Sequence, residues 1–249
     1  MQKHILIEYL TKGINILGNT KQNKNSKLGK ILIPYNQKIT LEENEMLKFS
    51  SDFLTKMKQR RTIRDYSSKN VPLEIIENAI ASAATAPSGA NQQPWHFVVV
   101  KNKHTKKEIR VAAEKEEFDF YNHKAPQEWL DALHHIGTDE QKPHLEDAPY
   151  LIIVFAERYS FDKYKNKIKN YYVSESVGIA TGMLLTSLHL SGLVTLTHTP
   201  SPMKFLNKIL NRPSNESPYL IIATGYPEKN AKVPKITKKS SAEFSSKYL

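Results

Sequence analysis

The sequence predicts an α+β domain in which helices outnumber strands. Two observations lead to this fold class. Several short segments are almost continuously apolar and rich in β-branched residues, which is typical of buried strands. Longer segments between them carry apolar residues at helical spacing among acidic residues and lysines. No internal repeat is present, and no boundary divides the apolar segments, so one domain is expected.

Helices are predicted at residues 41–59, from Pro72 to about residue 84, after Lys101, and at about 173–190. Pro72 suits the first helical position, and acidic residues follow it in the early turns. The last helix is nearly apolar all round and contains Gly178 and Gly182, which indicates the central helix of a core or of a dimer interface.

Strands are predicted at residues 96–100, 150–156, 193–197 and 219–224. The first follows a loop, residues 86–95, that contains proline, glycine and asparagine. Small residues in such a loop let the backbone approach a flat ligand closely.

The predicted organisation is an N-terminal arm at 1–40, a domain at 41–228 and a C-terminal arm at 229–249. Both arms are polar and rich in lysine. No run of 18 uninterrupted apolar residues occurs, so neither a signal peptide nor a membrane span is expected, and a cytoplasmic protein is predicted.

The net charge is +11, but the lysines are scattered and no nucleic-acid motif accompanies them. We expect a solvated basic surface and no nucleic-acid partner. The chain has no cysteine, which excludes disulfides, thiolate metal sites and a thiol nucleophile. Any redox chemistry therefore depends on a bound organic cofactor.

Three of the six arginines fall within five residues, Arg60-Arg-Thr-Ile-Arg64, although lysine supplies the other 30 basic residues. A guanidinium can grip a phosphate with two hydrogen bonds, which an ammonium cannot do. We interpret the cluster as an anion clamp for a phosphorylated cofactor. On these five residues alone, a salt-bridge cluster at a helix end explains the pattern slightly better.

Other site types find no support. The glycine-rich dinucleotide fingerprint and the P-loop are absent, which gives the arginines more weight as phosphate ligands. His134, His135 and His144 lack carboxylates at ligand spacing, so surface histidines and no metal site are expected. Ser88 is not part of a hydrolase nucleophile elbow.

Three segments follow one another in this part of the chain: the arginine segment, Val71-Pro72, and Ala86-Pro-Ser-Gly-Ala-Asn-Gln-Gln-Pro-Trp-His-Phe-Val-Val-Val100. Together they resemble the flavin-binding opening of the nitroreductase superfamily. Leu193-Val-Thr-Leu-Thr-His-Thr-Pro200 and Gly225-Tyr-Pro227 follow in the order of that superfamily. The resemblance covers roughly residues 40 to 240. It implies a mixed central sheet flanked by helices, bound FMN and a domain-swapped homodimer with its active sites at the subunit interface.

Within the superfamily the chain resembles the deiodinase branch, whose members carry a glutamate, a tyrosine four residues later and a lysine further on. Glu117, Tyr121 and Lys142 stand at these places. Residues i and i+4 project from one helix face, and Lys142 could close over them from the following segment. A carboxylate, a phenol and an ammonium complement an amino-acid zwitterion. Without the resemblance, ordinary helix-surface polarity would explain them.

The resemblance also implies roles for cofactor-binding residues. Arg60, Arg61 and Arg64 are expected to hold the FMN phosphate and the polar edge of the flavin. The loop is expected to reach the cofactor from the other subunit, and the Ala90 amide to donate to a substrate phenolate. Thr199 is our choice for the hydroxyl that hydrogen-bonds flavin N5 and so favours one-electron steps. The other expected cofactor contacts are Thr62, Pro87, Ser88, Thr197, His198 and Lys238.

Three residues or segments depart from the deiodinase pattern. Asn91-Gln92-Gln93 is closer to general nitroreductases, His198 replaces a threonine, and Lys238 replaces a second phosphate-binding arginine. Lys238 can supply charge but not a bidentate fork. The sequence does not decide whether Lys238 or Lys239 contacts the phosphate.

The function that the resemblance implies is FMN-dependent reductive dehalogenation of halotyrosines by stepwise electron transfer. NAD(P)H as an indirect electron donor and a reductase partner are further expectations. One alternative is a general nitroreductase or flavin reductase that acts on nitroaromatics or quinones by hydride transfer. Another is a flavoprotein that binds iodotyrosine or flavin without turnover.

Overall fold

The computed structural model describes residues 32–35 and 39–249. The chain divides into two units, Met1–Met46 and Leu47–Leu249. Of the first unit, the described residues are exposed and include the first turn of helix α2. The predicted N-terminal arm at 1–40 lies largely outside the described residues. The second unit carries the folded domain.

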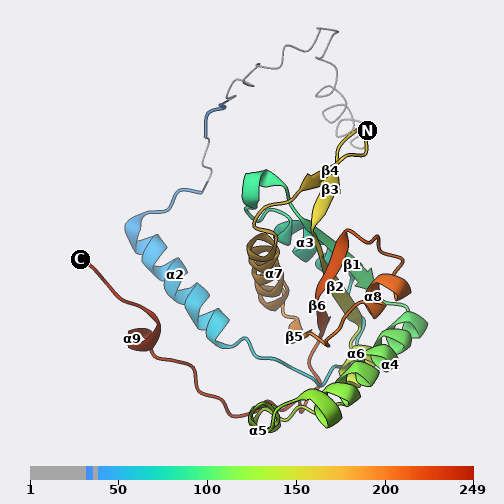
Figure 1. The fold of residues 1–249 in the computed structure, drawn as a ribbon. Helices are drawn as coiled ribbons and strands as arrows, with labels where there is room; N and C mark the ends of the chain where they lie inside the picture. Colours follow the sequence, from blue (N-terminus) through green and yellow to red (C-terminus); the bar gives the residue numbers. More distant parts are fainter. Residues whose placement is uncertain (1–31, 36–38) are drawn as a thin grey trace. The chain divides into compact units, whose positions relative to one another are not determined.

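Helices and strands alternate irregularly along the chain (Figure 1). The helices are α2 (Glu43–Lys58), α3 (Leu73–Ala83), the 3-10 turn η1 (Gly89–Asn91), α4 (Lys103–Asp119), the π-helical turn η2 (Phe120–Lys124), α5 (Gln127–His135), α6 (His144–Asp147), α7 (Val173–Leu190), α8 (Phe205–Ile209) and α9 (Ser241–Phe244). The strands are β1 (Trp95–Val100), β2 (Tyr150–Glu157), β3 (Tyr159–Phe161), β4 (Lys167–Lys169), β5 (Val194–His198) and β6 (Glu216–Gly225).

The central sheet has the strand order β1-β2-β6-β5, and every neighbouring pair of strands is antiparallel. A parallel bridge between Thr62 and Thr195 adds the arginine segment beside β5. A sheet with both parallel and antiparallel pairs was expected, and this bridge beside β5 is its parallel part. A small hairpin of β3 and β4, which the sequence analysis did not predict, stands apart from the sheet.

Helices cover both faces of the sheet. Alternate residues of β2 enter different cores: Tyr150, Ile152 and Val154 pack with α3 and α7, whereas Leu151, Ile153 and Phe155 pack with α4, α6 and α8. Figure 1 shows α7 and α4 on opposite sides of the strands. Since both faces are buried, the strands read as continuous apolar runs although the sheet is antiparallel.

The predicted helices and the four predicted strands are confirmed, with ends within a few residues. The helix predicted at 173–190 matches α7. Among the described residues, no helix is long and apolar enough to cross a membrane.

The C-terminal segment leaves β6 and turns back along the arginine segment. The Glu228 N–H donates to the Asp65 carbonyl at 3.0 Å, and Tyr66 forms an antiparallel bridge with Pro227. The predicted C-terminal arm therefore begins next to the residues of the candidate phosphate site, and it contains the short helix α9.

Candidate active site

The arginine segment is fixed to the edge of the sheet. The Ile63 N–H donates to the Thr195 carbonyl at 3.2 Å, and the Ile63 side chain is buried. The polar residues around it line a hollow of about 280 Å³. Its lining consists of Arg60, Arg61, Thr62, Arg64, Ile136, Thr197, Pro234, Ile236 and Lys238.

This hollow concentrates positive charge without a matching acid. Within the described part of the chain, neither the three arginines nor Lys238 forms an ion pair with a carboxylate, and the contact of the Arg61 guanidinium is the Pro234 carbonyl. The alternative of a salt-bridge cluster at a helix end is therefore not what these residues form. Half-buried guanidinium groups with free donors suit a phosphate.

A second hollow of about 350 Å³ adjoins the first, because Arg64, Ile136 and Thr197 line both. It brings together the three residues that the sequence analysis selected for a zwitterion, Glu117, Tyr121 and Lys142, with residues of β5 and the segment after it. The other lining residues are Glu116, Phe120, Trp129, Leu133, Thr138, His144, Leu196, His198, Thr199 and Ser201.

Glu117 is the centre of a buried charged cluster. Its Oε2 lies 3.5 Å from the Lys142 Nζ, and its Oε1 lies 3.5 Å from the His198 Nε2. The side chains of Lys142 and Glu117 are only 3% and 13% exposed. Burial raises the pKa of Glu117 and lowers the pKa of Lys142, while the mutual attraction of the two charges opposes both changes. Both groups therefore lack the solvation that their charges require.

Tyr121 reaches this cluster from an irregular turn. The i, i+4 spacing suggested one continuous α-helix face, but α4 ends at Asp119 and Tyr121 lies in the π-turn η2. Turns of this kind are frequent at functional sites. The Lys142 Nζ lies 5.3 Å from the Tyr121 ring centroid, so the two residues still face each other. Burial raises the pKa of the Tyr121 phenol, which is therefore protonated and able to donate.

Two histidines complete the cluster. The His144 and His198 rings meet edge to face at 5.9 Å, and the Nε2 atoms of both are buried without a hydrogen-bond partner in the described chain. Burial lowers the pKa of His144 to about 4 and that of His198 to about 3, so both are neutral at pH 7. The expectation that His144 is a surface histidine is wrong, because α6 turns it inward beneath α4. Only its proximity to Lys142 in the sequence could have drawn attention to it.

Thr197 and Thr199 are exposed and flank His198, the buried last residue of β5. Both line the second hollow, and Thr197 also lines the first. A planar group that extends from the arginine segment toward Tyr121 would pass these hydroxyls. Lys238, and not Lys239, lines the arginine hollow.

The loop with Pro87, Ser88 and Ala90 lines neither of these hollows. The Ser88 Oγ accepts from the Gln93 N–H at 2.9 Å, and the Gly89 N–H donates to the Ser176 Oγ at 3.3 Å. Ala90 has φ 50°, a left-handed conformation that alanine rarely adopts. Within one protomer the structure does not bring this loop to Glu117. Its contact with cofactor or substrate from a second subunit stays a prediction.

A family model, sequence relatives and solved structures all relate this chain to the nitroreductase family. The model of the nitroreductase family matches residues 57–226. The iodotyrosine deiodinase of Haliscomenobacter hydrossis is 53% identical over 201 residues, which cover 81% of this chain and 90% of that protein. The human iodotyrosine deiodinase 1 is 40% identical over 200 residues, 79% of this chain and 68% of that protein.

Solved structures agree with the sequence comparisons. A crystal structure of oxidized iodotyrosine deiodinase bound to FMN and 3-iodo-L-tyrosine matches with a TM-score of 0.67 and 31% identity, over 78% of this chain and 99% of that chain. A Bacteroides fragilis nitroreductase with bound FMN matches with a TM-score of 0.58 and 22% identity, over 80% of this chain and 99% of that chain. The second match concerns the fold alone.

Proposed function

The chain belongs to the nitroreductase family, with iodotyrosine deiodinases among its relatives, and we propose that it uses FMN to remove halide reductively from halotyrosines, giving tyrosine and halide. The observation that carries this proposal is the buried group of Glu117, Tyr121 and Lys142 beside a hollow rich in arginine. The first set complements an amino-acid zwitterion, and the second complements a phosphate.

The residues present fit FMN. Arg60, Arg61 and Arg64 offer guanidinium donors without competing carboxylates in the described chain, and Lys238 adds a fourth positive charge. These residues would hold the phosphate tail and the polar edge of the ring system. Reduced FMN bound here would supply two electrons, which together with one proton replace the carbon–halogen bond by a carbon–hydrogen bond and release the halide ion. Thr199 is the residue that we propose for a polar contact with the ring.

The substrate's polar end would enter the charged cluster. Glu117 lies 3.5 Å from both Lys142 and His198, and the Lys142 ammonium also donates to Thr138 and Asp139. A zwitterion offers each a new partner: its ammonium approaches Glu117, and its carboxylate approaches Lys142 and the Tyr121 hydroxyl. Phe120 and Trp129, whose ring centroids lie 5.0 Å apart, form an apolar wall of the same hollow, against which an aromatic ring can pack.

We propose a homodimer as the active form. Helix α2 exposes Leu47, Phe49 and Phe53, and an apolar hollow between α2 and α7 is lined by Ile179 and Leu190, among others. Exposed apolar surface of this extent on two neighbouring helices indicates a protein interface. A reductase partner that draws electrons from NAD(P)H and a cytoplasmic location complete the proposal.

The experiment is a halide-release assay with the purified protein. The protein should be yellow, and with dithionite as reductant it should release iodide from 3-iodo-L-tyrosine but far less from 2-iodophenol, which lacks the zwitterion. Binding of iodotyrosine without iodide release would favour a binding protein. Reduction of nitroaromatics by NAD(P)H without any iodide release would favour a general nitroreductase.

A further inference from the structure

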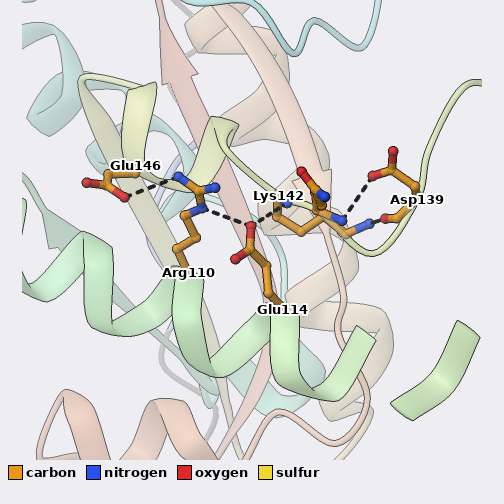
Figure 2. A network of polar contacts seen from close by, with 6 residues as sticks. Arg110, Glu114, Asp139, Lys142 and Glu146 are labelled. Atoms are coloured by element: carbon orange, nitrogen blue, oxygen red, sulfur yellow. Dashed lines mark hydrogen bonds and ion pairs between the residues drawn. The ribbon is translucent and has the colours of Figure 1, made fainter. Parts of the chain in front are cut away.

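The Glu114 carboxylate links the zwitterion site to a polar network on helix α4. Its Oε1 accepts from the Lys142 backbone N–H at 2.7 Å and from the Arg110 Nε at 2.8 Å. The Arg110 Nη1 donates to the Glu146 carboxylate at 3.3 Å. Figure 2 shows Arg110 between the two glutamates and Glu114 between Arg110 and Lys142. Helix α4 is thus joined by one continuous set of polar contacts to Lys142 and to Glu146 of α6.

Lys106, one turn before Arg110, extends the same face of α4. It is buried, and its Nζ donates to the Glu146 carbonyl at 2.7 Å and to the Ala148 carbonyl at 2.6 Å. Three α4 side chains at i, i+4 and i+8 therefore hold the chain from residue 142 to residue 148 against the helix. Residues 144–148 are fixed by buried contacts that do not depend on Glu114.

The segment just before Lys142 is held differently. The Gln141 N–H donates to the Asp139 Oδ1, and the Lys142 Nζ donates to the Asp139 carbonyl and, at 3.4 Å, to the Thr138 Oγ1. These bonds close the turn on itself. The Lys142 N–H attaches the backbone of this turn to Glu114 of helix α4. The same helix carries Glu117, three residues after Glu114.

We propose that Glu114 is a positioning residue for Lys142: by holding the Lys142 amide, it fixes the Lys142 ammonium opposite Glu117 at the spacing of an amino-acid zwitterion. That the ligand is an amino acid rests on the proposed function. The hydrogen bond between Glu114 and the Lys142 amide does not depend on it. A carboxylate suits this place because one oxygen serves two donors, one of them charged.

The chemistry of the contact predicts an order among variants. Glu114→Gln keeps an oxygen that can accept from the Lys142 amide but loses the ion pair with Arg110. Glu114→Ala leaves the Lys142 N–H without a partner and the Arg110 guanidinium with Glu146 alone, which is the costlier change. Glu108→Gln is the matched control, since Glu108 lies on the same helix, is half exposed and pairs with His104 at 3.8 Å, away from the site.

The experiment titrates the FMN-loaded proteins with 3-iodo-L-tyrosine and follows flavin fluorescence. Glu114→Ala should raise the Kd about tenfold or more, as expected for a lost charge-assisted hydrogen bond, and Glu114→Gln should raise it less. Glu108→Gln should stay within about twofold. Binding of 2-iodophenol, which has no zwitterion, should change equally little in all variants. Weakening of both ligands to the same extent by Glu114→Ala would overturn the positioning role.

Hydrogen exchange of the peptide that contains Lys142 tests the contact without any substrate. Glu114→Ala should accelerate exchange of this peptide, whereas Glu108→Gln should not, and equal exchange in wild type and Glu114→Ala would overturn the inference. A wild-type protein that binds no halotyrosine would refute the proposed function and leave this test standing. If Glu114→Ala does not fold, Glu114→Asp replaces it: the shorter carboxylate keeps its charge but should lose the Lys142 amide and accelerate the same exchange.

Discussion

Glu117 and Lys142 form an ion pair from which water is almost excluded, so each depends on the other for its charge. A bound zwitterion adds a second partner to each. Glu117→Gln and Lys142→Ala should therefore weaken binding of 3-iodo-L-tyrosine by about 1.5–3 kcal/mol, the size of a lost hydrogen bond to a charged group. Flavin fluorescence titration measures this effect.

The FMN content of both variants should stay near that of the wild type, because neither residue lines the hollow of the arginines. Unchanged halotyrosine binding in both would show that the zwitterion does not enter this cluster.

His198 and His144 give the protein a defined sensitivity to acid. Their folded-state pKa values of about 3 and 4 lie below the ordinary 6.5, so the unfolded chain binds protons first as the pH falls. Stability is complete above pH 6.5 and declines as the pH drops below it, by about 2 kcal/mol per histidine at pH 5. At pH 5 this loss depends mainly on the unfolded-state pKa, since both folded-state values lie lower. Glu117, with its raised pKa, contributes in the opposite sense.

Urea denaturation at pH 7.5 and pH 5 measures the loss. The His198→Gln variant should lose about 2 kcal/mol less than the wild type between these pH values. His134→Gln serves as the control because His134 is exposed. An equal acid loss in wild type and His198→Gln would contradict a neutral, buried His198.

The histidines also show which contacts of single residues could not be predicted from the sequence. Glu117, Tyr121 and Lys142 were selected because they stand at the places of the family pattern, whereas helical spacing alone would have left them as ordinary surface polarity. The approach of His198 to Glu117 was not predicted, because it depends on how β5 packs against α4. His198 was expected only beside the flavin. Contacts between residues distant in the chain follow from tertiary packing and leave no periodic signal.

At the scale of elements, the C-terminal segment completes the arginine hollow through Lys238, while the neighbouring Lys239 does not line it. A positive charge near a phosphate stabilises binding even without bidentate geometry. Lys238→Ala should therefore lower the affinity for FMN by about 0.5–1.5 kcal/mol, and Lys239→Ala should lower it by less. Titration of the apoprotein with FMN at low and moderate salt measures both, and the difference should shrink as salt increases.

The elements themselves were largely predictable, and the failures have physical causes. The helices and central strands carry strong periodic or apolar patterns, which survive in α3, α7 and β2. Apolar runs report burial on two faces, not strand direction, so they could not predict that the named strands of the sheet pair antiparallel. The π-turn η2 is a local rearrangement after Asp119 that α-helical periodicity cannot specify.

At the scale of the whole molecule, the residues proposed for the site form two sets that one protomer keeps apart. The arginine segment and the zwitterion cluster adjoin each other, whereas the loop around Ala90 is bound to the start of α7. If two protomers pair as we propose, the loop of each serves the site of the other. This arrangement is open to a test in which each protomer carries a different defect.

One variant, Arg60→Ala with Arg64→Ala, loses two of the guanidinium groups in the phosphate hollow. The other, Ala90→Pro, removes the proposed amide donor and cannot adopt φ 50°, because proline fixes φ near −65°. Each should be inactive as a homodimer. A heterodimer purified through two different tags combines the intact arginines of one chain with the intact loop of the other in one of its two sites. It should therefore release iodide at about half the wild-type rate, whereas a loop that serves its own protomer would leave both sites broken and the heterodimer inactive.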